Sequence, residues 1–147
     1  MSSEIIKFNG EHLKSIISQD MNKHQRDVFP DELIEQIEKR SCQITILYKD
    51  KIMLCGGVTP YWPGRAELWS VFSENSRQYL VPTIRAMKWW IREQIKLNFR
   101  RLEWASSVDN LNSKRMAKII GFKLEIECAK NYLPNGEDCS IFSMVRS

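Results

Sequence analysis

The stretch that decides the fold is Asn110-Leu-Asn-Ser-Lys-Arg-Met-Ala-Lys-Ile-Ile-Gly121-Phe122. It predicts a short helix that ends at a glycine and passes directly into a strand at Phe122. Asn110 is the expected N-cap, because its amide oxygen can accept from a free N–H group of the first helical turn. Gly121 stands where a left-handed C-cap is common. The apolar stripe of this helix is formed by Met116, Ile119 and Ile120.

Hydrophobic periodicity predicts alternating strands and helices along the rest of the chain. The expected strands cover residues 4–8, 42–48, 52–58, 66–73, 101–108, 122–133 and 138–145. The other expected helices cover residues 11–20, 31–40 and 78–97. The order is therefore βααβββαβαββ, an α/β (α+β) arrangement with a mixed, mostly antiparallel sheet and helices on both faces. We expect residues 1–147 to form a single domain.

Turn residues separate these elements. The polar run 49–51 predicts a tight turn between two strands, residues 60–64 predict a loop, and Pro134-Asn-Gly136 is a strong turn signal. Gly56-Gly57 inside a strand indicates either a bulge or a close approach of another backbone. The apolar face of the long helix is expected to be Leu80, Ile84, Met87, Ile91 and Ile95.

Composition excludes several classes of protein. The 147 residues are 43% hydrophobic and 27% charged, which is typical of a globular domain. No apolar run is long enough to span a bilayer and the N-terminus lacks the layout of a signal peptide, so we expect a cytoplasmic protein. Cys42 and Cys55 fall in expected strands and are predicted to be buried thiols, while the spacing of the four cysteines does not suit a metal site.

The segment from Asn110 and Ser113 to the Gly-Phe pair resembles the last helix of the GNAT N-acetyltransferases, and the element order is also that of this superfamily. The resemblance implies acetyl-CoA as cofactor and direct transfer of the acetyl group to a protein or small-molecule amine. It implies that backbone groups of Val71, Phe72 and Ser73 bind pantetheine. Asn110 and Ser113 would contact the pantetheine arm or the CoA sulfur, or else serve only as cap and first-turn residue of the helix.

The pyrophosphate loop of the superfamily, Gln/Arg-x-x-Gly-x-Gly/Ala, corresponds here to residues 78–83. Gln78 fits this pattern, but Val81 and Thr83 replace small residues and Pro82 lacks an N–H group. Side chains are candidates to replace the missing backbone donors. These candidate phosphate contacts are Arg77, Gln78, Arg85 and the hydroxyl group of Thr83. The alternative is that the two arginines form a solvated helix face.

Acetyl transfer to an amine needs a base for the incoming ammonium group. The resemblance implies that Glu67 is this base, with Glu103 as second choice, or that Glu67 is a carboxylate at the rim. In many members a tyrosine acts as the general acid at the position where this chain has Ala117. The branch that acetylates ribosomal-protein N-termini also lacks this tyrosine. The segment 61–65, which contains Tyr61 and Trp62, would lie near the acceptor amine.

Trp89 and Trp90 of the long helix indicate core or interface packing, and a solvent-facing indole would mark a protein contact.

Two other functions remain open. The Gly-Gly strand, the tryptophan after Glu67-Leu68, the eroded glycine loop and the closing Gly-Phe hairpin are similar to a small acetyltransferase-like family of short-tailed phages. That resemblance implies a catalytically inactive protein that binds virion or host proteins, located in the host cytoplasm.

A basic strip on the long helix and directly after it would suit binding of nucleic acid. Because the net charge of +4 is small, nucleic-acid binding is the least favoured of the three functions. The strip consists of Arg85, Lys88, Arg92, Lys96, Arg100 and Arg101.

Overall fold

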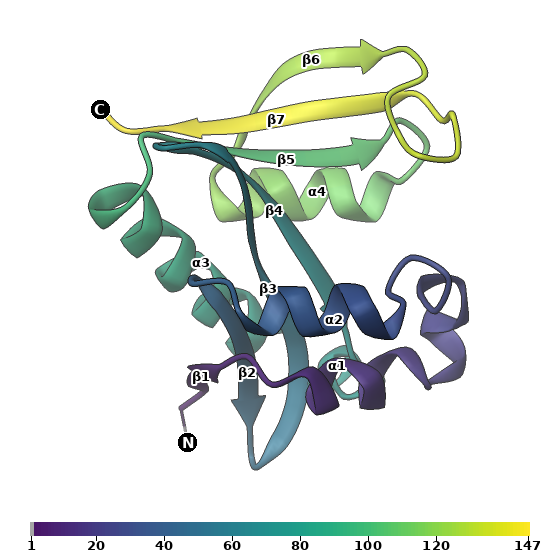
Figure 1. Ribbon diagram of the computed structural model, residues 1–147. Coiled ribbons are helices and arrows are strands. Elements are labelled where there is room, and N and C mark those ends of the chain that lie inside the picture. Colours follow the sequence, from purple (N-terminus) through teal and green to yellow (C-terminus); the bar gives the residue numbers. More distant parts are fainter. Residues whose placement is uncertain (1) are drawn as a thin grey trace. The chain divides into compact units, whose positions relative to one another are not determined.

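The computed structural model describes residues 2–147 and confirms the predicted element order. The strands are β1 Glu4–Lys7, β2 Gln43–Tyr48, β3 Lys51–Trp62, β4 Arg65–Phe72, β5 Arg101–Ser107, β6 Lys123–Ala129 and β7 Cys139–Val145. The helices are α1 Gly10–Ile17, α2 Asp31–Glu38, α3 Leu80–Leu97 and α4 Leu111–Ile120, with short 3-10 helices η1 Asp20–Gln25 and η2 Glu74–Arg77. The strands form one sheet in the order β1-β2-β3-β4-β5-β7-β6 (Figure 1). The β4–β5 pair is parallel, and the pairs β1–β2, β2–β3, β5–β7 and β6–β7 are antiparallel, as a mixed sheet requires.

The described chain forms two compact units. The first contains the chain up to Val58 together with Trp69–Met87. The second contains Thr59–Leu68 and Lys88–Ser147. β3, β4 and α3 each contribute residues to both units.

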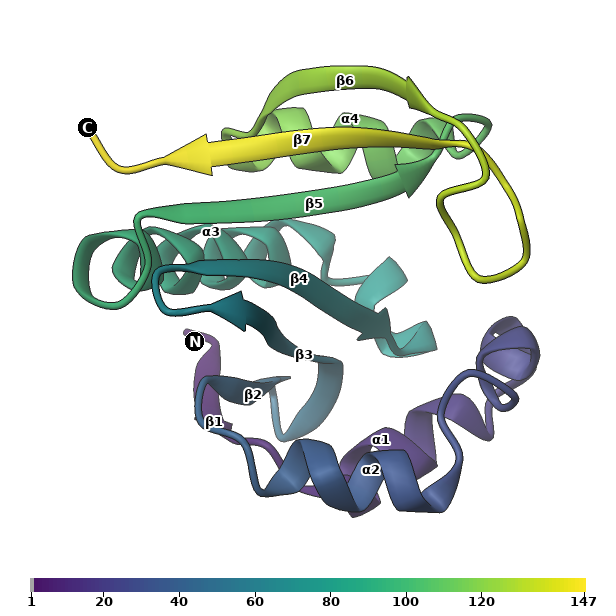
Figure 2. The same cartoon turned by 45° about the horizontal axis from the view of Figure 1, so that its top comes forward.

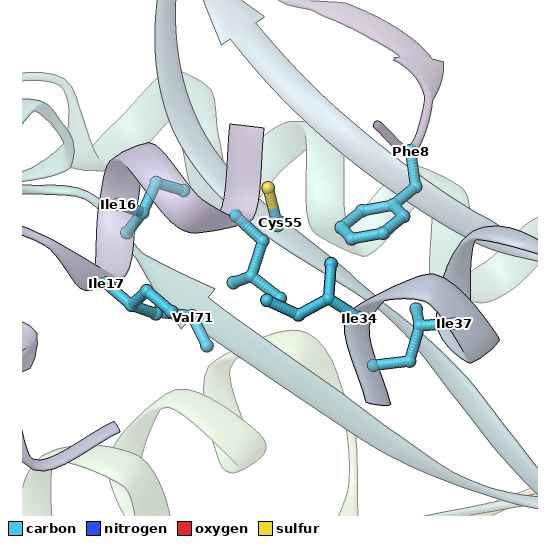
Figure 3. Packing of buried hydrophobic residues seen from close by; sticks show 8 residues of the cluster. Phe8, Ile16, Ile17, Ile34, Ile37, Cys55 and Val71 are labelled. Carbon is cyan, nitrogen blue, oxygen red and sulfur yellow. The ribbon is translucent and has the colours of Figure 1, made fainter. Parts of the chain in front are cut away.

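The core of the first unit is an apolar cluster to which α1 and α2 contribute isoleucines. The two helices lie side by side (Figure 2). α2 begins at Asp31 as predicted, directly after Pro30. α1 begins at Gly10, one residue earlier than predicted, because Asn9 caps it by accepting from the N–H of Glu11 at 2.9 Å. Figure 3 shows how the side chains from the helices meet those from the strands. The cluster consists of Phe8, Leu13, Ile16, Ile17, Ile34, Ile37, Cys55 and Val71.

Gly56 and Gly57 are required by close backbone approach, which was one of the two predicted reasons. A Cβ atom on Gly56 would lie 2.8 Å from the backbone oxygen of Trp69, and one on Gly57 would lie 2.6 Å from that of Cys42. The bulge lies elsewhere, because the β2–β3 register shifts between Ile46 and Leu47. The strand therefore has no room for side chains at the two glycines.

Replacing Gly57 by alanine is expected to lower the free energy of unfolding by about 1–3 kcal/mol, because overpacking forces the neighbouring backbone to move. Urea denaturation followed by circular dichroism measures the loss. Lys51→Ala, at an exposed position of the same strand, is the control and should change the stability by less than about 0.5 kcal/mol. An equal effect of the two substitutions would contradict the close-approach interpretation.

The predicted loop over residues 60–64 is wrong, because β3 continues to Trp62. The chain reverses at Pro63-Gly64, where Gly64 has a φ of +92°. Proline followed by glycine at positive φ suits the two central positions of a type II turn. Pro60 is accommodated because this end of the strand is exposed, where a missing ladder donor is tolerated. Tyr61 and Trp62 are thus strand residues.

Some predicted apolar faces were also wrong in detail. Leu80 is 43% exposed because α3 starts there, two residues later than expected, after the 3-10 turn η2. Ile119 of α4 is 58% exposed, and Ala117 and Ile120 are buried in its place. Trp89 is exposed and Trp90 is buried. The buried face of α3 is formed by Thr83, Ala86, Met87, Trp90, Ile91 and Gln94.

The cysteine prediction holds for Cys55 and fails for Cys42. Cys55 is buried in β3, and burial raises the pKa of its thiol to about 12. Cys42 precedes β2 and is half-buried with a φ of +63°. It turns the chain into the strand, so it is not part of the ladder.

The second unit contains the helix–strand segment of residues 110–122. The Oδ1 atom of Asn110 accepts from the N–H of Ser113 at 3.1 Å, and Gly121 has a φ of +117°. The N–H of Phe122 donates to the carbonyl of Ala117 at 2.9 Å, which closes a Schellman motif. Both predicted caps are confirmed. α4 lies along β5 (Figure 1).

The strands of the closing hairpin are shorter than predicted. β6 ends at Ala129 and β7 begins at Cys139, so residues 130–138 form a loop around the predicted turn. Asn131 and Gly136 both have positive φ values in this loop.

Candidate functional site

Glu67 lies on β4, in the second unit, and its carboxylate is held by a neutral hydroxyl group. The Oη atom of Tyr61 donates to its Oε2 atom at 3.0 Å. Burial and, after it, the hydroxyl group of Tyr132 in the 130–138 loop raise the pKa of Tyr61. Glu67 is half-buried, and this burial raises the pKa of its carboxyl group. The nearby negative charge of Glu103 raises this pKa further. The hydrogen bond from Tyr61 and the positive charge of Arg65 lower it. The net direction is upward, which suits a base.

Glu103 is the register partner of Glu67 on β5 but has a different environment. It is 2% exposed and forms ion pairs with Arg65 and Arg101. Arg65 donates from Nη2 to Oε1 at 3.1 Å, and Arg101 donates from Nε to Oε2 at 2.8 Å. Burial opposes ionisation, but these bonds bring the pKa of Glu103 below its ordinary value. Because both oxygens accept from guanidinium groups, Glu103 is a poor candidate for the base.

The ion pairs continue to the edge strand β6. Arg101 donates to both carboxylate oxygens of Glu125, at 2.9 and 2.6 Å. Ser143 of β7 donates to the same carboxylate at 2.6 Å, and these hydrogen bonds lower the pKa of Glu125 to about 2. The ion pairs therefore join β4, β5 and β6, and the neutral hydroxyl group of Ser143 adds a hydrogen bond from β7.

Asn110 and Ser113 both have structural partners. Asn110 caps α4, as described above. The Oγ atom of Ser113 accepts from Nε1 of Trp104 at 3.0 Å and forms a hydrogen bond with the hydroxyl group of Ser106. The start of α4 is thereby fixed to β5. A contact of either residue with pantetheine remains a prediction.

The residues predicted to meet pantetheine lie in the first unit, Val71 and Phe72 at the end of β4 and Ser73 directly after it. The side chain of Val71 is buried in the apolar cluster. The N–H of Ser73 donates to the carbonyl of Met53 at 2.8 Å, so it faces β3. Because successive N–H groups of a strand point to opposite sides, the N–H of Phe72 points away from β3. The carbonyl of Phe72 accepts from Nδ2 of Asn22 at 2.7 Å.

The candidate phosphate contacts surround the start of α3. The side chains of Arg77, Gln78 and Arg85 are exposed. Thr83 is fully buried, and its hydroxyl group donates to the carbonyl of Tyr79 at 2.8 Å. The hydroxyl proton of Thr83 is therefore used within the helix, whereas the other three side chains are accessible to an anion.

The predicted residues are divided between the two units. The second unit contains Glu67, Glu103, Asn110 and Ser113, and the first contains Val71, Phe72, Ser73, Arg77, Gln78, Thr83 and Arg85. The sequence interpretation missed the roles of Tyr61, Tyr132 and Asn22. A turn assigned to Pro63-Gly64 was the available signal that Tyr61 is a strand residue in the hairpin that also carries Glu67.

Residues 2–147 contain no group of three or more metal-ligating side chains suited to a metal ion. Within the same range, no helix has the length and apolar character needed to cross a membrane.

Comparisons with known proteins identify the fold. No family model and no curated protein sequence matches the chain. Among solved structures, Ard1 from Thermoplasma volcanium is similar with a TM-score of 0.79 at 13% identity, covering 100% of this chain and 99% of that one. The ribosomal-protein-S5-alanine acetyltransferase from Vibrio fischeri has a TM-score of 0.73 at 18% identity, with coverage of 100% and 94%.

A third similar structure is the ribosomal L7/L12 α-N-protein acetyltransferase in complex with coenzyme A. Its TM-score is 0.75 at 14% identity, with coverage of 99% of this chain and 94% of that one. At these identities the likenesses concern the fold. The chain has the GNAT acetyltransferase fold, as the resemblance in its sequence implied.

Proposed function

We propose that this protein is an acetyl-CoA-dependent N-acetyltransferase that acts on a protein or small-molecule amine by direct transfer. The observation that carries the proposal is Glu67, a half-buried carboxylate on β4 with a raised pKa and a hydroxyl group as its hydrogen-bond donor. A base of this kind holds a proton closer to neutral pH than an exposed glutamate does. The solved structures of similar fold include acetyltransferases of ribosomal proteins, which supports a protein amine as acceptor.

The residues present fit acetyl-CoA as the donor of an acetyl thioester. The parallel ladder joins residues 65–67 of β4 to residues 101–103 of β5, and β4 continues beyond it to Phe72. We propose that the N–H of Phe72 meets the thioester carbonyl, where a fixed donor stabilises developing negative charge. Arg77 and Gln78 would bind the phosphates in place of the glycine-rich loop. Thr83 would join them only after its hydroxyl group leaves the Tyr79 carbonyl.

In this mechanism Glu67 would take a proton from the ammonium group of the acceptor. Bound acetyl-CoA would supply the acetyl group as a thioester, so that a C–N bond to the amine would replace the C–S bond. The second N–H proton of the amine would end on the leaving sulfur. Ala117 is buried and carries no acidic group, so α4 contributes no proton at that position. Asn110 and Ser113 would align the pantetheine arm.

The alternative is a binding or assembly protein without catalysis, of the phage-encoded type. One observation favours it: the start of α3 carries Pro82 and no glycine, so it presents fewer backbone donors to a pyrophosphate than a glycine-rich loop does. Both readings place the protein in a cytoplasm.

Binding of acetyl-CoA separates the two functions. At a ligand concentration about 100 times the dissociation constant, the enzyme should gain about 2.7 kcal/mol of stability, seen as a rise in melting temperature. Titration calorimetry gives the dissociation constant directly. Arg77→Ala should weaken binding, whereas Lys39→Ala, which removes an exposed cation from the end of α2, should not. The absence of any shift at millimolar acetyl-CoA would overturn the proposed enzyme and favour the assembly protein.

A further inference from the structure

Two carboxylates lie next to each other in the sheet and have opposite surroundings. Glu67 and Glu103 are direct register partners in the parallel β4–β5 ladder. Glu103 binds two guanidinium groups, while the hydrogen bond to Glu67 comes from the phenol of Tyr61. Pairs of titratable groups held in unlike environments are characteristic of acid–base sites.

The position of Arg65 explains this difference. Arg65 precedes Glu67 by two residues on the same strand, so both side chains project from one face of β4. Its guanidinium group lies 4.5 Å from the ring centres of both Tyr61 and Trp62 while it binds Glu103. The aromatic contacts and the buried carboxylate direct the cation towards Glu103.

We propose that Tyr61, Arg65 and Glu103 form a positioning device for Glu67, an inference that rests on the proposed function. Tyr61 orients the carboxylate through a neutral hydroxyl group. Glu103 binds the guanidinium group that would otherwise pair with Glu67. Glu67 is thereby kept available to an incoming ammonium group.

The device makes two opposite predictions for the protonation of Glu67. The charged and titratable groups that act on Glu67 are Tyr61 from β3, Arg65 from β4 and Glu103 from β5, and Glu67 in turn acts on the thiol of Cys139 from β7. Tyr61→Phe removes a hydrogen bond to the ionised carboxylate, so the pKa of Glu67 should rise. Glu103→Gln removes a like charge and releases Arg65, so the pKa of Glu67 should fall.

The test is a titration of the full chain carrying ¹³C-labelled glutamate, followed by NMR of the side-chain carboxyl groups. The spectrum of a Glu67→Gln variant assigns the Glu67 signal. Matched controls are Tyr48→Phe, which removes a phenol hydroxyl from β2, and Glu125→Gln, which removes a carboxylate from the other end of the ion-pair chain. The pH dependence of kcat/KM is recorded for the same variants, and its acidic limb should move with the NMR midpoint.

Opposite displacements of the Glu67 midpoint in Tyr61→Phe and Glu103→Gln, with unchanged midpoints in both controls, would support the device. Unchanged midpoints in these two variants, or displacements in the same direction, would overturn it. The Tyr61 variant loses a single hydroxyl group from a partly exposed side chain, so it tests the proposal even if Glu103→Gln does not fold. Because the NMR measurement needs no substrate, opposite displacements without transferase activity would refute the proposed function and leave the positioning device supported.

Discussion

Replacing Glu67 by glutamine is expected to lower kcat for acetyl transfer by about 10²- to 10⁴-fold, the usual contribution of a general base. The amide keeps the shape of the side chain and can still accept the hydrogen bond from Tyr61. It cannot take the proton of the acceptor's ammonium group. Binding of acetyl-CoA should be unchanged, because the contacts proposed for the cofactor involve other residues.

The pH profile provides a second readout of the same substitution. In the wild-type protein the rate should fall as the pH falls through the pKa of Glu67, because the base becomes protonated. Since burial raises that pKa, the fall should begin at a higher pH than for an exposed glutamate. The glutamine variant should lack this acidic limb.

Initial rates with acetyl-CoA and an amine acceptor, measured together with calorimetric binding of acetyl-CoA, complete this experiment. Glu127→Gln, an exposed carboxylate on β6, is the control and should retain the wild-type rate. Equal values of kcat in wild-type and Glu67→Gln proteins would exclude Glu67 as the base.

Local features of the fold could be predicted from the sequence because their causes are local. The cap formed by Asn110 and the positive φ of Gly121 each depend on a few neighbouring residues. The same holds for the tight turn predicted over residues 49–51, which the chain makes at Lys49 and Asp50 between β2 and β3. Signals of this kind are present in the residue types themselves.

Features that depend on partners distant in sequence were predicted less well. The exposure of Ile119 depends on which face of α4 meets the sheet, and three neighbouring apolar residues do not settle this. β3 extends through Pro60, whereas proline in a sequence ordinarily indicates the start of a loop. Pro60 lies at an exposed end of β3, where the strand ladder tolerates the missing N–H donor of a proline.

The candidate site shows the same limit. Glu67 could be predicted as the base because it lies on the strand where the GNAT resemblance implies a catalytic glutamate. Its relation to Glu103 depends on a parallel register between strands separated by α3, and no short-range pattern reports such a register. The different roles of the two carboxylates follow from the side chains that reach them.

Phe142 on β7 is the position at which core packing should matter most for stability in the second unit. It is completely buried and is the largest fully buried side chain of the described chain. Its register partners are Trp104 on β5 and Leu124 on β6. Trp104 in turn packs against Phe122, with ring centres 5.6 Å apart, and donates to Ser113 of α4. The ring of Phe142 therefore supports the strand that anchors the start of α4.

Phe142→Ala is expected to lower the free energy of unfolding by about 3–5 kcal/mol, from lost burial and from the cavity that remains. Urea denaturation followed by circular dichroism measures this loss. Phe142→Leu keeps most of the volume and should cost less than about 1.5 kcal/mol. Leu124→Ala is the matched control, because Leu124 pairs with Phe142 but is 47% exposed, and its truncation should cost much less. A loss of below about 1 kcal/mol for Phe142→Ala would show that the sheet can close the cavity, and that β5 does not depend on this ring to hold α4.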